Sequence, residues 1–190
     1  MMTDALDPNE VRLTGENSYI RMTDEDGGPV LTRVSHWRVL LSPGGPGHML
    51  FLKSDLTNDE VRLYSDNIAL ARWLQEEIER DPEYADQNIP VTEAVFSKSG
   101  DVVSFWTEMV DTEEESIALT WYDFGEPFVV DVPPDASRTH GVYSCLVPAR
   151  RVQVTANGEV ARGRAFPTVS FGAESSTSCL ALSETWTRPR

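Results

Sequence analysis

Charged side chains interrupt two apolar strand faces near the C-terminal end of the chain. Glu184 alternates with leucines and Trp186, so its carboxylate is expected among large apolar groups. Arg162 and Arg164 alternate with apolar residues in the preceding predicted strand. Because an unpaired buried ion is costly, neighbouring strands would pair Glu184 with one of these arginines. The alternatives are a purely structural ion pair, or charges that face water.

The predicted pairing would suit the binding of an anionic substrate. Guanidinium groups hold planar oxyanions through two parallel hydrogen bonds, so Arg162 and Arg164 would form an anion or carboxylate clamp. Glu184 would orient them or act as a general acid or base. The sequence therefore predicts acid–base chemistry on an anionic small molecule.

The three histidines are further candidates for proton transfer. His140 precedes a glycine and His48 follows a glycine turn, positions that would frame the mouth of a barrel. Ordinary polar rim residues are the alternative at both positions. His36 is expected to point away from the core. No His-x-His or His-x-x-x-His spacing is present, and phosphate-loop and nucleophile-elbow motifs are absent, so we expect neither a metal nor a cofactor.

A second carboxylate and two aromatic residues complete the predicted site. Glu108 shares a strand face with Trp106, and the opposite face of that strand is more apolar. Glu108 is therefore expected to be exposed or half-exposed, where it would contact the substrate. Tyr143 and Trp186 are predicted to form apolar walls.

Short segments with strand periodicity, separated by turn residues, position these candidates. Asn157-Gly158 is the dipeptide best suited to a two-residue hairpin turn. The loop at 167–178 is long enough to act as a flap beside a site, or it is simply mobile. The predicted strands cover residues 18–22, 29–42, 48–53, 60–64, 91–98, 102–110, 116–123, 128–132, 141–147, 151–156, 159–166 and 179–187.

One helix is predicted within this β pattern, over residues 67–80. Ser65 or Asp66 would cap it, and Asp81-Pro82 would end it, because the residue before proline disfavours the α region. Its first half is apolar on most sides, whereas its second half is mostly polar. We therefore expect the helix to cover one end or one flank of the β structure.

About ten to twelve antiparallel strands in one chain must close into a barrel or stack as two sheets. The pattern resembles that of lipocalin-like, or calycin-like, barrels. In the first barrel strand of a lipocalin the resemblance implies a Gly-x-Trp motif, and the nearest match, Ser35-His36-Trp37, lacks the glycine. Residues 1–17 are expected to form a loosely held arm, and 18–190 a single β-barrel domain.

Charge and composition restrict the partners of the protein. The formal net charge of −15 repels phosphate backbones and anionic lipid surfaces, so we expect no nucleic-acid or membrane partner. The N-terminal residues lack the features of a secretory signal, which predicts a cytoplasmic location. In that compartment Cys145 and Cys179 are expected to be free thiols. An unpaired edge strand would make a homodimer plausible.

These observations predict a small-molecule enzyme of the lyase, isomerase or hydratase type, acting in a barrel pocket on an aromatic or carboxylated metabolite without a cofactor. A carrier or sensor with the same pocket and no turnover is the first alternative. The second is an accessory subunit that binds a partner chain through exposed apolar strand faces.

Overall fold

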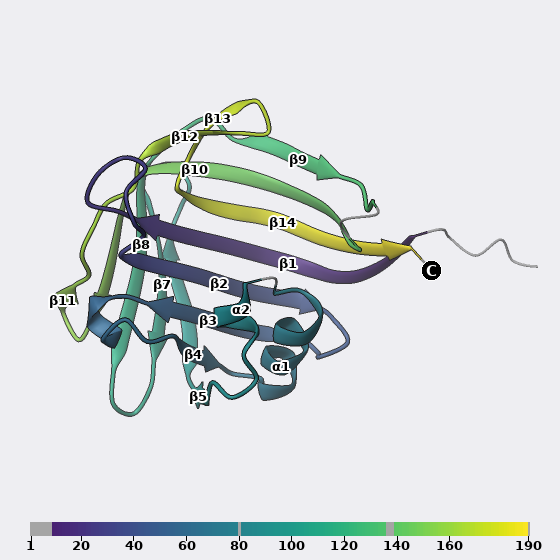
Figure 1. Cartoon of the computed structure of the whole chain (residues 1–190), viewed down its shortest axis with the longest axis horizontal. Helices are drawn as coiled ribbons and strands as arrows, with labels where there is room; N and C mark the ends of the chain where they lie inside the picture. The colour runs from purple at the N-terminus through teal and green to yellow at the C-terminus, as the bar shows by residue number, and fades with distance from the viewer. Residues whose placement is uncertain (1–8, 80, 136–138, 190) are drawn as a thin grey trace, which may run out of the picture.

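The computed structural model describes residues 9–79, 81–135 and 139–189. The chain is mainly β, and a 12-stranded sheet curls into a nearly closed barrel, as predicted in outline (Figure 1). In sheet order the strands of the main path are β5 (Val91–Glu93), β4 (Arg62–Ser65), β3 (Gly47–Lys53), β2 (Thr32–Leu41), β1 (Asn9–Met22), β14 (Ser178–Pro189), β10 (Gly141–Ala156), β8 (Ser116–Phe124), β7 (Phe105–Asp111) and β6 (Val95–Gly100). The remaining strands are β9 (Phe128–Val132) and β11 (Glu159–Val160), which pair with β10, and β12 (Pro167–Ser170) and β13 (Ala173–Ser176), which form a separate hairpin.

The long strand β10 joins two parts of the barrel. Its first half lies between β14 and β9, and its second half pairs with β8. Figure 1 shows β7 and β8 running across the direction of β1 to β3. The two ends of the strand order nearly meet, because only Ala94 separates β5 from β6 and its amide donates to the Ser65 carbonyl at 3.2 Å. One neighbouring pair, β4 and β5, is parallel, so the sheet is not purely antiparallel as predicted.

Apolar side chains from both parts fill the barrel lumen. Ile20, Leu50 and Leu52 from β1 and β3 face Ile117, Leu119 and Trp121 from β8, and all six are fully buried. Burial on this scale dominates the stability of such a domain. The lumen is thus a packed core rather than the open pocket that the sequence predicted.

Helix α1 (Ile68–Glu77) covers the outer face of β2, β3 and β4, which confirms the predicted helix with different ends. Asn67, rather than Ser65 or Asp66, caps it by accepting hydrogen bonds from the amides of Ala69 and Leu70. The chain then begins a second short helix, α2 (Pro82–Ala85), and a 3-10 turn, η1 (Asp55–Thr57), precedes β4. No helix in the described ranges is long and apolar enough to span a membrane.

The predicted N-terminal arm is wrong where it can be compared. Residues 9–17 belong to β1, which lies between β2 and β14 in the centre of the sheet, and residues 1–8 lie outside the described residues. The arm was inferred from polar composition. Polar residues are tolerated here because β1 has one face toward solvent or a groove along part of its length.

The C-terminal third differs from prediction around a correctly predicted hairpin. Asn157 and Gly158 both have positive φ, 51° and 85°, and turn β10 into β11, as a type I′ turn requires. The strand predicted to reach Phe166 ends at Val160. Gly163 has a φ of +99° and lies against Met22 too closely for a Cβ, and the next residue, Arg164, forms an isolated antiparallel bridge with Thr23. The predicted loop at 167–178 contains the β12–β13 hairpin.

Candidate functional site

A β-bulge in β14 determines which way Glu184 points. Tyr143 of β10 pairs with Thr185, and Cys145 pairs with Leu182, so β14 has one more residue than β10 between these pairs. The irregularity includes Ser183, whose φ is +57°. An extra residue reverses the alternation of side chains beyond it. Leu182 consequently packs on the lumen core, whereas Glu184 faces the outside of the barrel.

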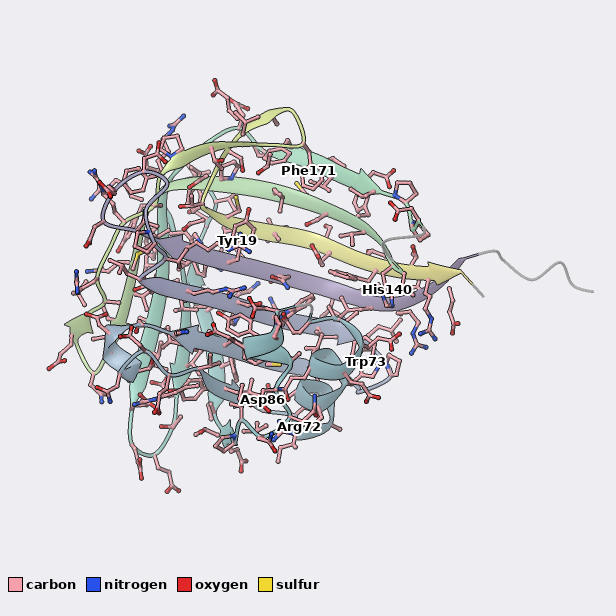
Figure 2. The ribbon with its side chains drawn as sticks, viewed as in Figure 1. Tyr19, Arg72, Trp73, Asp86, His140 and Phe171 are labelled. Carbon is pink, nitrogen blue, oxygen red and sulfur yellow. The ribbon has the colours of Figure 1, made fainter. Side chains whose placement is uncertain are left out.

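The outer face of β1, β14, β10 and β9 holds a groove of about 360 Å³, which we call the Glu184 groove. This volume lies within the range of small-ligand sites. Figure 2 shows Tyr19, Phe171 and His140 on this side of the molecule. The groove is lined by Asn17, Tyr19, Val130, Val132, Val142, Ser144, Leu146, Phe171, Ala181, Glu184 and Trp186, of which only Glu184 carries a carboxyl group.

Glu184 is 6% exposed and has one strong fixed hydrogen bond. Its Oε1 accepts from the indole Nε1 of Trp186 at 2.7 Å. Burial raises the pKa of the Glu184 carboxyl, while the Ser144 hydroxyl and the Trp186 indole act in the opposite direction. Among the described residues, none of the ion pairs within 4.0 Å includes Glu184. The groove thus contains a carboxyl without a cationic partner.

Tyr19 and Asn17 from β1 form the opposite wall of the groove. The Tyr19 hydroxyl donates to the Cys179 Sγ at 3.1 Å, and burial raises the pKa of this phenol. Tyr19, Asn17 and Trp186 also line an adjoining hollow of about 270 Å³ that extends to α2. There Glu79 accepts from the Trp37 indole at 3.1 Å, and burial raises the pKa of Glu79 to about 7. A buried carboxyl, Glu184, and a half-buried one, Glu79, each held by an indole, therefore lie along one face.

Phe171 projects from the tip of the β12–β13 hairpin and lines the groove. It is 71% exposed and has a φ of +52°, an unusual backbone conformation for a bulky side chain. Exposed apolar area and backbone strain at one residue are features that gather at ligand contacts. The predicted flap is thus an ordered hairpin whose tip borders the groove.

The predicted ion pair between Glu184 and an arginine is wrong. The neighbours of β14 are β1 and β10, so the segment that carries Arg162 and Arg164 is not beside it. The Arg162 guanidinium contacts Asp24 at 3.0 Å on the surface, and that of Arg164 lies 4.6 Å from the centre of the Phe166 ring. Arg162 and Arg164 therefore form no anion clamp with Glu184.

Trp186 lines the groove beside Glu184, whereas the remaining predicted site residues are dispersed. His140 is buried behind Trp186, with ring centres 5.8 Å apart, and its Nε2 lies 3.3 Å from Glu77 Oε1. His48 Nδ1 contacts Asp66 at 2.7 Å at the barrel mouth. Tyr143 lies on the face of β10 opposite Ser144 and is 43% exposed, so it forms no wall of the groove.

Glu108 is inside the barrel, contrary to prediction, and so is His36. Both are almost fully buried, and His36 Nε2 lies 3.9 Å from Glu108 Oε2 across the lumen. Glu108 Oε1 accepts from the Trp106 indole at 2.7 Å. Burial raises the pKa of Glu108 to about 7 and lowers that of His36 to about 3. At neutral pH the imidazole is uncharged and the carboxyl is partly protonated.

Charged side chains close the lumen above this pair. Arg38 and Lys98 lie 3.8 and 3.9 Å from the two oxygens of Glu16, and the Lys98 ammonium lies 4.6 Å from the Trp106 ring centre. No pocket opens onto His36 and Glu108 among the hollows found in the described residues. The pair is a buried acid–base combination that lines none of these hollows.

Three larger hollows lack comparable chemistry, and the smallest of them, of about 400 Å³, is lined by Pro134, Asp135, Thr139 and Arg188. Another of about 450 Å³ lies between Pro148 and the β12–β13 hairpin, and its charged residues, Glu126, Arg150 and Glu174, are all exposed. The third, of about 780 Å³, is bordered by acidic residues of the turn after β7. Solvated charges of this kind are ordinary surface features. Among these hollows of the described residues, the Glu184 groove is the one that combines ligand-sized volume, apolar walls and a buried carboxyl.

Several groove residues were missed from the sequence. Asn17 was assigned to the arm and Ser144 to a strand with no assigned role, although a polar residue in an apolar strand is the signal that drew attention to Glu184.

Cys145 and Cys179 are both free thiols. The described part of the chain has no group of three or more His, Cys, Asp or Glu side chains placed to hold a metal ion. No family model, curated protein or solved structure matches the chain.

Proposed function

We propose that the protein binds a small, largely apolar molecule in the Glu184 groove and holds a polar group of that molecule at Glu184. One observation carries the proposal: a carboxyl that is 6% exposed lies in a groove whose other lining residues are uncharged. Removing such a group from water is unfavourable unless a partner compensates for it. A ligand supplies that compensation and covers the apolar walls.

Binding of 2-phenylethanol, followed by amide chemical shifts in NMR spectra, tests the proposal. We expect shifts concentrated in β9, the first half of β10 and residues 181–186 of β14. Val142→Trp should abolish them, because the indole fills the groove from a half-buried position. Val129→Trp is the matched control, since Val129 lies on the opposite face of β9 from Val130 and is 56% exposed. Shifts that survive Val142→Trp, or none in the original protein, contradict the proposal.

Replacing Phe171 by asparagine should separate stability from binding. Asparagine tolerates a positive φ far better than phenylalanine and would create an Asn-Gly turn like that at 157–158. We expect the free energy of unfolding to rise by up to about 1 kcal/mol. The affinity for 2-phenylethanol should fall several-fold, because the groove loses an apolar wall. Urea denaturation and NMR titration measure the two effects, and an unchanged affinity would remove Phe171 from the site.

Proton transfer to the bound molecule is a second candidate function. Its support is the raised pKa of Glu184, which favours a protonated carboxyl that can donate in an apolar site. A carrier and an enzyme differ at this residue: Glu184→Gln would remove turnover with binding kept in an enzyme, and would change only affinity in a carrier.

A further inference from the structure

We infer that the molecule bound in the Glu184 groove is an organic cation, a primary or secondary ammonium group on an apolar and preferably aromatic body. The inference rests on the proposed function, and it specifies the charge of the ligand. It reverses the anionic substrate predicted from Arg162 and Arg164, since both arginines lie elsewhere. It starts from a buried carboxyl that forms no ion pair within 4.0 Å among the described residues.

The contacts of Glu184 leave a place for an ammonium group. One carboxylate oxygen is held by the Trp186 indole, and the Ser144 hydroxyl lies beside the carboxyl. The Ser144 Oγ is buried without a hydrogen-bond partner among the described residues, so it can accept from a ligand, and the Asn17 amide supplies another acceptor in the wall. An ammonium group offers two or three N–H donors, which matches these acceptors.

The aromatic walls favour the same charge. Tyr19, Phe171 and Trp186 line the groove, and the faces of such rings attract cations. One of these rings already has a cation beside it, because the Arg21 guanidinium lies 5.8 Å from the centre of the Tyr19 ring. No lysine, arginine or histidine is among the residues that line the Glu184 groove. An anionic ligand would therefore meet Glu184 without a compensating charge among the residues that line the groove.

The charge of the whole chain acts in the same direction. A net charge of −15 produces a negative potential that concentrates cations near the surface and repels anions. This long-range effect is not specific to the groove, so the experiment must separate it from the effect of Glu184. Glu114 is exposed and remote from the residues that line the groove, and it serves as the control carboxylate.

Three probes of similar size and different charge test the inference: 2-phenylethylamine, 2-phenylethanol and 3-phenylpropanoate, titrated at pH 8 into the full chain and followed by NMR. We expect the amine to bind about tenfold more tightly than the alcohol, and the carboxylate to bind most weakly. Glu184→Gln should weaken binding of the amine about tenfold and change that of the alcohol by less than about twofold. Glu114→Gln should leave both affinities nearly unchanged.

Proton release gives a second measurement that needs no variant. An ammonium group pairs with the ionised carboxylate, so amine binding should expel a proton from protein molecules in which Glu184 is protonated. Affinity for the amine should then rise with pH as Glu184 ionises in the free protein. The groups that face this carboxyl are Tyr19 from β1, Ser144 from β10 and Trp186 from β14, with Arg21 beyond Tyr19 and His140 beyond Trp186. Calorimetry in two buffers of different ionisation enthalpy measures the released protons.

The outcomes distinguish the two proposals. An alcohol that binds as tightly as the amine, or a carboxylate that binds best, overturns the cationic class and leaves the groove as a binding site. If Glu114→Gln weakens amine binding as much as Glu184→Gln does, the amine responds only to the negative potential of the whole chain. That result also overturns the inference. Failure of all three probes to bind the original protein overturns the proposed function together with the inference.

Discussion

Replacing Glu108 by glutamine is expected to raise the free energy of unfolding by about 2 kcal/mol above pH 8, with a gain that shrinks toward pH 4.5. Glu108 is buried in the lumen, and its pKa is raised from 4.5 to about 7. Above pH 7 the folded protein must therefore hold a carboxylate that its surroundings disfavour. Glutamine keeps an acceptor for the Trp106 indole and offers a donor to His36 without acquiring charge.

The sign follows from proton binding. Between pH 4.5 and 7 the folded state binds more protons at Glu108 than the unfolded state, so stability falls as the pH rises. His36 acts the other way, because its pKa is lowered from 6.5 to about 3. Between pH 3 and 6.5 the unfolded state binds more protons at His36, so this residue makes stability rise with pH. The variant removes only the Glu108 contribution. Glu16, Arg38 and Lys98 face the pair from the barrel mouth and are unchanged.

Urea denaturation at intervals from pH 4.5 to 9 measures this effect, with Glu114→Gln as the exposed control. The control should show no gain that grows with pH. If Glu108→Gln lowers the free energy of unfolding equally at every pH, the surroundings of Glu108 stabilise the ionised carboxylate. The claim that burial disfavours its charge would then be wrong. The increase in the free energy of unfolding should approach the maximum that the pKa shift of Glu108 allows only if water does not enter the lumen.

The parts of the fold that were predicted correctly are those fixed by local sequence. Asn157-Gly158 selects its turn through two positive φ values, and the apolar residues at 70, 71 and 74 give α1 one buried face. The central position of β1 was missed because it depends on pairing with β14, about 170 residues later in the chain. The composition of a segment indicates whether it prefers solvent, but it does not indicate which strands the segment pairs with.

The candidate groove contains two residues of the predicted site, but on the opposite face of the sheet from the one expected. Glu184 and Trp186 were assigned to the same face as Leu182, and the bulge places the two on the other side of the sheet. Strict alternation also placed Glu108 toward water, because both faces of β7 carry large apolar residues and the better-covered face cannot be identified from one strand. Which face is buried depends on the strands that cross it. A carboxylate in an apolar strand was nevertheless an informative signal in both cases.

The bulge at Ser183 is open to a direct test through its backbone conformation. Ser183 is exposed and has a φ of +57°, so substitutions there act mainly through the main chain. Ser183→Gly is expected to raise the free energy of unfolding slightly, by up to about 1 kcal/mol, because glycine adopts a positive φ without steric cost. Ser183→Val should lower it by about 2 kcal/mol, because a β-branched side chain is strongly disfavoured in this region. Urea denaturation of both variants gives the difference.

The same pair of variants connects the backbone to the site. A valine that resists a positive φ favours a β14 without the extra residue, and a regular strand would turn Glu184 and Trp186 toward the lumen. We therefore expect Ser183→Val to weaken binding of 2-phenylethylamine as well as stability, and to change the amide shifts of residues 182–186. Ser183→Gly should retain both the affinity and the shifts. Equal stability of the two variants would show that Ser183 does not adopt the left-handed conformation. The bulge would then not explain why Glu184 faces the groove.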